Sequence, residues 1–571
     1  MADLSNEDIL FKDSVYSAIG LSAAVIHQQL DFDNFLVTIL ASEVQKQKPG
    51  YNILRRRIAI LIGQWVTIRI TKENRPLLYQ MFQHLLDSSE PHNDLVVRIT
   101  AGRQFKNVAD EWEFDAQQFM PYAETILTRL MRLIEEIDST ETKMALLNTI
   151  SVLVERLEHH ITPYAGRIVE MLPPLWEQSG DEHLMKQAIL AILTRLVNAL
   201  KAQSTPYHPM LIPIIQGAVE PDSETQLYLL EDALDLWHAI IIQSQQPASA
   251  ELLSLARYLI VIFELGSESL RKALEITESY LMLAPQDMLS DTMRKPFLTS
   301  FSSLLGTLKP EANGMLNNII ELVVRSAESL GGEDAVKQVT LDLIEVDFLP
   351  KQLQGLHSAW TAHCTTGPLA KEPSVDGVVE TDYFSVLARI ILGSTSTSLS
   401  AIQHCSLPES ATTGDENLKW LLEEWFSHME NIGDPSRRKL MALALTKLLE
   451  TNHPSVLANL QLLMTMWTDV ITELREDANG EILGPMTDHL VFEDPAQLRL
   501  VEEGAVEAPE DERRRMLSFA DPVHRVRLPE FVQGHLRMAI QAAGGEERFQ
   551  SEWLVNVDRE VVAAFGKMGI L

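Results

Sequence analysis

The sequence predicts an all-α protein, an α-solenoid of stacked helix pairs, and three observations support this class. Hydrophobic residues make up 46% of the 571 residues but aromatic residues only 6%, so Leu, Ile, Val, Ala and Met dominate, as suits helix-on-helix packing. Apolar residues recur at intervals of three and four with short turns between the runs. The resulting pairs repeat about every 40 to 45 residues, which is the period of armadillo-like helical repeats.

Residues 75–110 contain the clearest of these helix pairs. An apolar stripe at helical spacing marks the first helix and consists of Leu77, Leu78, Met81, Phe82, Leu85 and Leu86. Turn-forming residues and a proline follow, and then Asp94, Val97 and Arg98 match the Asp-x-x-Val-Arg opening of the second helix of a HEAT repeat. In that pattern the Asp and Arg side chains form polar ladders between stacked repeats. The alternative is an ordinary antiparallel helix pair, but the continuing rhythm on both sides favours stacked HEAT-like units.

The same pattern predicts the other helices in chain order. In the first half of the chain we expect helices over residues 9–30, 32–47, 52–71, 119–137, 142–158, 164–178, 182–201, 208–219, 226–243, 249–265 and 267–283. In the second half we expect helices over residues 296–308, 315–330, 333–346, 350–363, 383–392, 417–431, 435–451, 455–474, 528–542 and 546–565.

The spacing and composition also predict how the chain is organised. We expect regular HEAT-like repeats over 1–285, less regular helical repeats over 286–392, a mobile linker over 393–416, helical repeats over 417–475, an acidic insertion with a basic end over 476–515, and C-terminal capping helices over 516–571. In the insertion, residues 476–512 carry twelve carboxylates against Arg499 alone, so mutual repulsion predicts that part of it is a mobile loop.

Three consecutive arginines, Arg55, Arg56 and Arg57, suggest two roles. They could bind phosphate or an acidic partner. However, three successive residues point round most of a helix and cannot form one flat patch. We therefore favour pairing between repeats together with solvation.

Composition excludes several classes of function. Eighty acidic against 47 basic residues give a formal net charge of −33, which repels nucleic acid and anionic lipid and attracts basic proteins; solubility alone is the alternative reason for such a charge. The two cysteines, Cys364 and Cys405, exclude a disulfide framework and fit a reducing compartment. The acidic start does not resemble a secretory signal, and no apolar stretch is long enough to span a bilayer, so we expect no membrane insertion.

No motif for catalysis, a cofactor or a metal is found in the sequence. The phosphate-binding, dinucleotide-binding and nucleophile-elbow patterns are all absent. His363–Cys364 and His404–Cys405 lack the spacing of zinc ligands, so we expect no zinc site from these two pairs. We therefore expect a protein that is not an enzyme, and the sequence assigns no partner-binding residue.

Several stretches together resemble the importin-β superfamily (the karyopherin-β proteins), most closely its importin eleven type, including fungal members. They include KDSVYSAIGL, LRRRIAILIGQWV and YLLEDALDLW and occupy residues 12–21, 30–36, 54–66, 94–122, 228–237 and 513–532. The resemblance is strong up to about residue 285 and mainly positional beyond it. No stretch resembles the importin N-terminal domain, so the resemblance implies that the chain corresponds to a C-terminal portion of such a receptor.

This resemblance implies a nuclear transport receptor that shuttles between cytoplasm and nucleus through the nuclear envelope. The implied partners are protein cargo, nucleoporins and the Ran GTPase in its GTP form, with Ran binding weakened because the N-terminal repeats of the family supply much of that contact. No nucleic-acid partner is implied. Two alternatives remain from the residues alone: a static HEAT-repeat scaffold or regulatory subunit of a protein complex, and an enzyme whose site has no recognisable motif.

Overall fold

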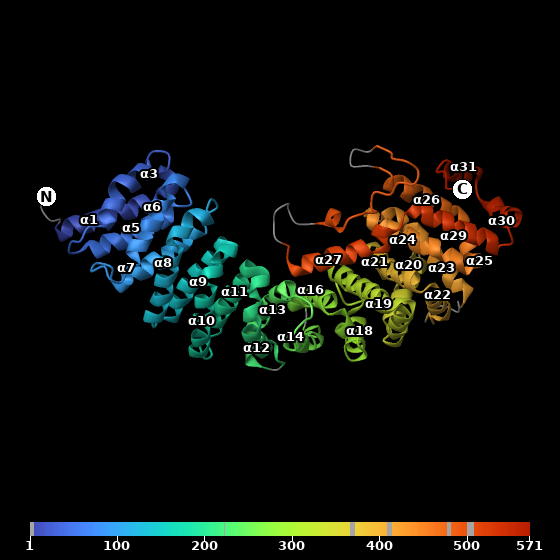
Figure 1. The fold of residues 1–571 in the computed structure, drawn as a ribbon, viewed down its shortest axis with the longest axis horizontal. Helices are drawn as coiled ribbons and strands as arrows, with labels where there is room; N and C mark the ends of the chain where they lie inside the picture. The colour runs from blue at the N-terminus through green and yellow to red at the C-terminus, as the bar shows by residue number, and fades with distance from the viewer. Residues whose placement is uncertain are drawn as a thin grey trace. The chain divides into compact units, whose positions relative to one another are not determined.

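The computed structural model describes residues 5–221, 223–265, 267–365, 372–407, 414–476, 481–499 and 507–570. Within these residues the regular secondary structure is helical, apart from one isolated bridge between Glu476 and Ile482. The prediction of an all-α protein is confirmed (Figure 1). The chain divides into two compact units, Met1–Gln243 and Ser244–Leu571.

The first unit is a double layer of helices. In one layer α1, α5, α7, α9, α11 and α13 each pack against the next, and in the other α4, α6, α8 and α10 follow one another. Each helix of the second layer pairs with one of the first, so the unit is a stack of helical repeats. Its helices are α1 (Asn6–Leu21), α2 (Ala23–Ile26), α3 (Phe32–Phe35), α4 (Ala41–Val44), α5 (Tyr51–Trp65), α6 (Arg75–Leu85), α7 (Leu95–Ala109), α8 (Ala116–Glu136), α9 (Thr140–Leu157), α10 (Thr162–Gln178), α11 (His183–Leu200), α12 (His208–Val219) and α13 (Glu224–Gln243).

Polar contacts join neighbouring repeats at the residues that the HEAT pattern singles out. The side chain of Asp94 caps α7 by accepting from the backbone N–H of Val97, and it also accepts from Asn52 of the preceding repeat at 2.9 Å. Arg98 donates to Glu136 of the following repeat at 2.6 Å. The predicted polar ladder is therefore present on both sides of this repeat.

The three arginines on α5 also act mainly between repeats. Arg55 is fully buried and donates to Asn93 at 2.7 Å, while Arg57 donates to Asp13 at 2.7 Å. Arg56 is exposed to solvent. Pairing between repeats, rather than a flat basic patch, is confirmed.

The second unit continues the double layer. One layer runs through α16, α19, α21, α24 and α26, and the other through α18, α20, α23 and α25. Its helices are α14 (Ala250–Leu255), α15 (Tyr258–Ile262), α16 (Ser267–Leu283), α17 (Pro285–Met288), α18 (Asp291–Leu304), α19 (Pro310–Glu345), α20 (Phe348–Cys364), α21 (Gly377–Gly393), α22 (Thr395–His404), α23 (Asp415–His428), α24 (Pro435–Lys447), α25 (Pro454–Leu457), α26 (Leu460–Leu474), α27 (Pro509–Ala520), α28 (Pro522–Arg525), α29 (Leu528–Ala542), α30 (Glu546–Glu552) and α31 (Arg559–Gly566). Within α19 the backbone leaves the helical region at Gly332, whose φ is 62°, which agrees with the break predicted between residues 330 and 333.

The segment predicted to be a linker, 393–416, differs from expectation. Residues 395–404 form α22, which packs against α21 and α23. Its inner face buries Thr395, Ser398 and Ile402. The Ser- and Thr-rich segment therefore contains a short packed helix that its composition did not predict. Residues 408–413 of this segment lie outside the described residues.

The acidic insertion, 476–515, is irregular over most of residues 481–494 and helical at its end. Some of its carboxylates form ion pairs: Asp488 forms a fully buried ion pair with Lys439 at 2.7 Å, and Glu507 pairs with Arg499 and Arg515, each at 3.2 Å. The last residues of the segment belong to α27, which starts at Pro509 with three acidic residues in its first turn, a favourable start for a helix. Residues 477–480 and 500–506 lie outside the described residues.

Helices α27 and α28, with Asp521 between them, form a C-terminal brace that contacts several helices of the second unit. Helix α27 is labelled in Figure 1. The guanidinium of Arg513 donates to the backbone oxygen of Ser244, 269 positions earlier, and Arg514 pairs with Glu278 of α16 at 2.6 Å. Asp521 binds Arg325 of α19 at 3.1 Å and Arg389 of α21 at 2.9 Å. The brace therefore connects three helices of one layer through charged contacts.

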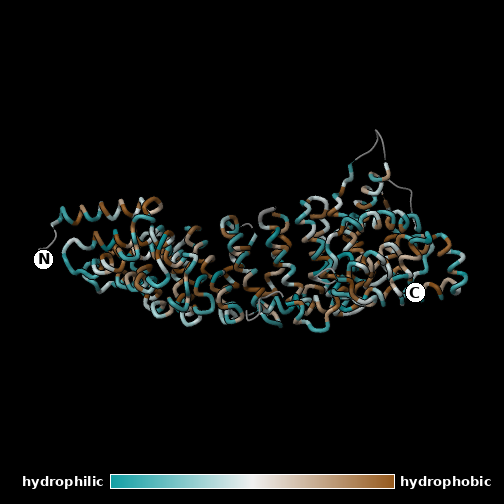
Figure 2. Tube along the Cα trace, turned by 90° about the horizontal axis from the view of Figure 1, so that it is seen from above, coloured by the Kyte–Doolittle hydropathy of each residue, from teal (hydrophilic) through white to brown (hydrophobic). Residues whose placement is uncertain are grey.

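Hydrophobic residues recur along the helices of both units and alternate with hydrophilic ones (Figure 2). The two units therefore bury apolar side chains repeat by repeat, and among the largest fully buried ones are Trp65, Trp237, Trp425 and Trp467. Among the described residues, every helix is too short or too polar to cross a bilayer.

Removing the carboxylate of Asp521 should destabilise the second unit. The residue is 6% exposed, and although burial opposes it, Arg389 and Arg325 hold the pKa of Asp521 below its ordinary value of 3.8. Asp521→Ala leaves a buried Arg389 with Glu321 alone, so we expect a loss of about 3–5 kcal/mol in the free energy of unfolding, measured by chemical denaturation above pH 5. Glu552→Ala, which breaks the exposed pair with Arg548, is the control and should change little. Equal effects of the two substitutions would contradict a role for the brace.

Candidate partner-binding sites

An exposed stripe of acidic and apolar side chains follows one face of α13 in the first unit. It consists of Glu224, Leu227, Tyr228, Glu231 and Asp235, and the exposed fractions of Leu227 and Tyr228 are 79% and 51%. These residues are three, four, seven and eleven positions from the first, so they lie on one side of the helix. We call them the α13 stripe.

The apolar part of the α13 stripe extends onto the neighbouring helix. The ring of Tyr228 stacks on His183 of α11, with centroids 4.2 Å apart, and Leu184 beside it is 63% exposed. Gln187 of α11 donates to the backbone oxygen of Tyr228 at 2.9 Å and fixes the two helices together. The surface therefore offers aliphatic and aromatic contact between carboxylates, which suits a partner segment that carries basic and apolar side chains.

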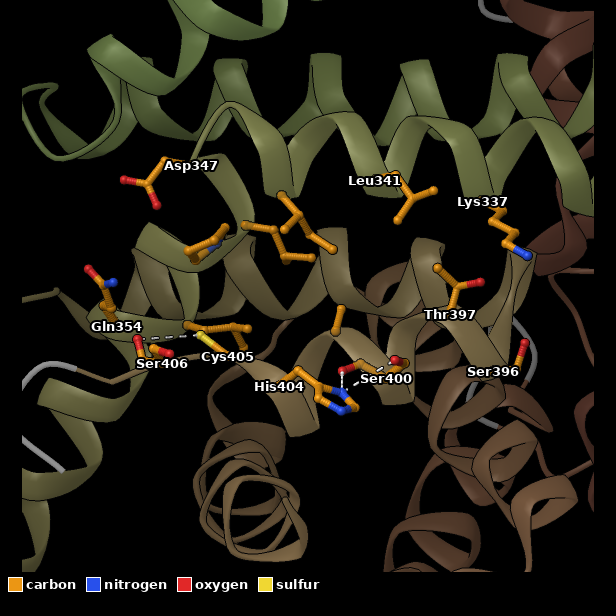
Figure 3. Close-up of a pocket in the computed structure, with 15 residues that line it drawn as sticks. Lys337, Leu341, Asp347, Gln354, Ser396, Thr397, Ser400, His404, Cys405 and Ser406 are labelled. Carbon is orange, nitrogen blue, oxygen red and sulfur yellow. Dashed lines mark hydrogen bonds between the residues drawn. The ribbon is translucent and has the colours of Figure 1, made fainter. Parts of the chain in front are cut away.

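The second unit contains a cavity of about 660 Å³ between α19, α20 and α22. Buried Leu349 and Leu353 contribute apolar surface, and Lys337, Asp347 and Ser396 are exposed. Figure 3 shows Leu341 and Lys337 of α19 facing Thr397 and Ser400 of α22 across the opening. A cavity of this size, apolar with a few polar groups, is suited to an apolar side chain of a partner.

His404 and Cys405, one of the pairs tested for zinc spacing, both line this cavity (Figure 3). The Nδ1 atom of His404 lies 2.8 Å from the backbone oxygen of Ser400. Burial, followed by the charge of Asp347, raises the pKa of the Cys405 thiol. The other histidine, His363, lies instead beside Glu424, so the described structure does not bring the two pairs together in one cluster.

Sequence reasoning identified neither the α13 stripe nor the cavity. For the stripe a signal was present, since Leu227 and Tyr228 interrupt the polar face of an otherwise regular amphipathic helix. For the cavity there was none, because its walls come from three helices, and one of them, α22, lies in the segment whose composition predicts a linker.

The repeat stack of two helical layers defines an α-helical repeat protein. A profile described as "Importin-11-like, TPR repeats" matches residues 187–570, more than half of the chain. The chain belongs to this Importin-11-like family, as the sequence resemblance implied.

Individual relatives agree with this assignment. Importin-11 of Mus musculus is 32% identical over 559 residues, covering 97% of this chain and 53% of the mouse protein. The importin beta-like protein kap113 of Schizosaccharomyces pombe is 27% identical, covering 90% of this chain and 49% of kap113. The chain thus spans about half the length of the curated relatives it matches.

A solved structure has the same fold. It is that of Lph2, a bidirectional nuclear transport receptor in S. cerevisiae, with a TM-score of 0.82 and 23% sequence identity, covering 99% of this chain and 57% of Lph2.

Filling the cavity should shield Cys405 without affecting Cys364. Cys364 is exposed, and Cys405 is half-buried in the cavity wall, so alkylation at pH 8 should be faster at Cys364. Ala401→Trp adds bulk to the cavity wall and should slow alkylation of Cys405 by iodoacetamide at least roughly threefold, measured by mass spectrometry of each cysteine peptide. Cys364 is the internal control. An unchanged rate at Cys405 would contradict an accessible cavity at this position.

Proposed function

We propose that this chain takes part in nuclear transport as a protein-binding receptor for cargo entering the nucleus. It would bind protein cargo, respond to the Ran GTPase in its GTP form, contact nucleoporins at the nuclear envelope and move between cytoplasm and nucleus. Membership of the Importin-11-like family supports this proposal, as does the fold shared with Lph2. Because the chain spans about half of its curated relatives, the activity of a whole receptor is extended to it here by inference.

The observation that carries the cargo-binding part of the proposal is the α13 stripe. Its carboxylates, on a chain of net charge −33, attract basic segments, and its exposed leucine and tyrosine offer apolar contact. Such a surface on one repeat binds weakly, but a stack of repeats lets several weak contacts add along one partner.

The role proposed is binding and not catalysis. The two sites described are an open helix face and an apolar cavity, and the relatives are named as importins. A partner that binds along such surfaces is held by many contacts of modest energy, which a change in the curvature of the stack would weaken together.

Neutralising the α13 stripe should weaken cargo binding mainly at low salt. The triple substitution Glu224→Gln, Glu231→Gln and Asp235→Asn should reduce the affinity for a fluorescent peptide rich in Lys, Arg and Leu by roughly tenfold at 50 mM salt, because exposed charge pairs contribute little each but add. At 500 mM salt the difference should nearly vanish because exposed charges are screened.

The matched control removes the same charge elsewhere. Glu546→Gln, Glu547→Gln and Glu560→Gln lie at exposed positions in the second unit and should leave peptide affinity within about twofold, measured by fluorescence anisotropy. Equal losses in both triple variants would show that net charge, and not the α13 stripe, attracts the peptide.

Ran–GTP should bind this chain at least roughly tenfold more weakly than it binds full-length mouse Importin-11, since the resemblance assigns much of that contact to N-terminal repeats of the family. Biolayer interferometry with Ran loaded with GTP or GDP measures both affinities. Equal affinity for Ran–GTP would contradict the correspondence with a C-terminal portion. A cargo complex of the full-length relative that ignores Ran–GTP would favour the static scaffold instead.

A further inference from the structure

Four side chains that the sequence does not group converge inside the second unit. His363 lies near the end of α20, Glu380 near the start of α21, and Glu424 and His428 on α23. Each offers one nitrogen or carboxylate oxygen, and these four atoms all lie within 4.8 Å of one another. Glu424 and His428 are four residues apart on one helix and therefore share a face.

Three members of this four-residue cluster are removed from solvent. Glu380 is 0% exposed, Glu424 3% and His428 7%, whereas the His363 side chain is 41% exposed. Apolar rings surround the buried side: Phe384 stacks on Trp425 with centroids 5.0 Å apart, and His428 lies 5.9 Å from Phe384. An apolar surround with one exposed ligand is the setting in which proteins hold a metal ion tightly and leave it a route of entry.

Neither carboxylate oxygen of Glu380 receives a hydrogen bond from the described residues. A fully buried carboxylate without donors is costly unless a cation or a proton lies beside it. The closest basic group is His428, whose Nε2 atom lies 3.6 Å from Oε1 of Glu380, longer than a hydrogen bond. The cluster therefore contains an acceptor that its own side chains leave unsatisfied.

The orientation of His428 directs a second hydrogen-bond acceptor, its Nε2 atom, towards the carboxylate of Glu380. Its Nδ1 atom lies 2.9 Å from the backbone oxygen of Glu424, and a backbone carbonyl only accepts, so Nδ1 carries the proton in that bond. In the neutral ring Nε2 then presents a lone pair towards Glu380. A hydrogen bond from the far ring nitrogen to a backbone carbonyl is the arrangement that orients histidine ligands of metals.

We propose that His363, Glu380, Glu424 and His428 form a binding site for one divalent transition-metal ion, and that Zn²⁺ is the ion they fit best. Two imidazole nitrogens and two carboxylate oxygens make a four-ligand set, which suits tetrahedral zinc, whereas Ca²⁺ and Mg²⁺ prefer oxygen ligands alone. Tetrahedral zinc would place the ligand atoms about 3.4 Å from each other. The Nδ1 atom of His363 lies 2.6 Å from Oε1 of Glu424, so zinc would have to separate these two atoms, which the exposed ring of His363 allows by rotating. With all four positions filled by the protein, the site would be structural.

Such an ion would join three helices of successive repeats. Glu380 belongs to the layer of α19, α21 and α24, whereas His363 and the two α23 ligands belong to the opposite layer. Zinc bound here would hold both layers together at the place where α20, α21 and α23 meet, and its binding energy would add to the stability of the folded unit.

The competing occupant is a proton shared by the two carboxyl groups. Burial, and next the Glu424 carboxyl, raise the pKa of Glu380 to about 8, the direction expected where two buried carboxyl groups face each other. A shared proton and a zinc ion would both relieve the repulsion between the two carboxylates. Glu380→Gln distinguishes them, because it removes a zinc ligand and so weakens zinc binding, whereas it removes a carboxyl group that would otherwise need a proton and so raises stability.

The test is a zinc titration of the full chain, stripped of metal with a chelator and without an affinity tag. We expect one Zn²⁺ per chain by competition with a chromogenic chelator, a higher midpoint of thermal unfolding with zinc, and the visible absorption of tetrahedral Co²⁺ when cobalt replaces zinc. His363→Ala and Glu380→Gln should each weaken zinc binding at least roughly tenfold, and both should remove the thermal shift.

Two further variants allow zinc binding to be interpreted even if the buried substitution Glu380→Gln impairs folding. His363→Ala alters an exposed side chain and should fold normally, and His404→Ala, an exposed histidine in the cavity of α19, α20 and α22, should bind zinc as the unchanged protein does. Zinc binding that is equal in the unchanged protein and in His363→Ala would overturn the proposal. A Glu380→Gln variant that is more stable than the unchanged protein, with no zinc-induced shift in either, would assign the cluster to a shared proton.

Discussion

The architecture depends on the fact that a single helix pair cannot bury its own apolar surface. In the first unit each of α5, α7, α9 and α11 packs between two neighbours of the same layer, so its buried face is completed by the repeats before and after it. A stack of this kind has no single centre, and its stability is a sum over repeats and over the interfaces between them. Its length can therefore grow while each exposed helix face remains available to a partner.

Polar contacts set the register of these interfaces. Trp65 donates to the backbone oxygen of Ile19, and Thr149 to that of Gly102, across separations of 46 and 47 positions, close to one repeat. Such bonds lie among buried apolar side chains, where a misaligned neighbour would leave a donor without an acceptor. The apolar residues thus drive stacking, and the polar ones select one alignment.

Local patterns predicted the fold because each repeat is built from neighbouring residues. Residues 94–98 alone predicted the helix cap at Asp94 and the polar contact of Arg98 with a neighbouring repeat. Gly331 and Gly332 predicted the break within α19. The contacts that escaped prediction join positions far apart. Asp521 meets Arg389 across 132 positions, and nothing local marks either residue as a partner of the other.

The candidate sites were hidden for the same reason. The cluster of His363, Glu380, Glu424 and His428 assembles from helices whose order in space is set by the stack, and only the Glu-x-x-x-His spacing on α23 is local. That spacing is common on solvated helices, so it identifies no site without the two partners. Composition was misleading for α22, because Thr395 and Ser398 are buried in a packed helix, whereas a run rich in serine and threonine is also typical of a flexible segment.

The C-terminal brace also affects the order in which the protein is made. Arg513 is synthesised 269 residues after Ser244, the backbone group it binds, which corresponds to roughly 15 to 50 seconds at ordinary rates of translation. During that interval the repeats of the second unit emerge from the ribosome and can stack on their neighbours, while the surfaces of α16, α19 and α21 that the brace later contacts remain uncovered. Chaperones that shield exposed charge and apolar surface therefore have a defined window in which to act on the nascent chain, and it closes only when α27 and α28 leave the ribosome.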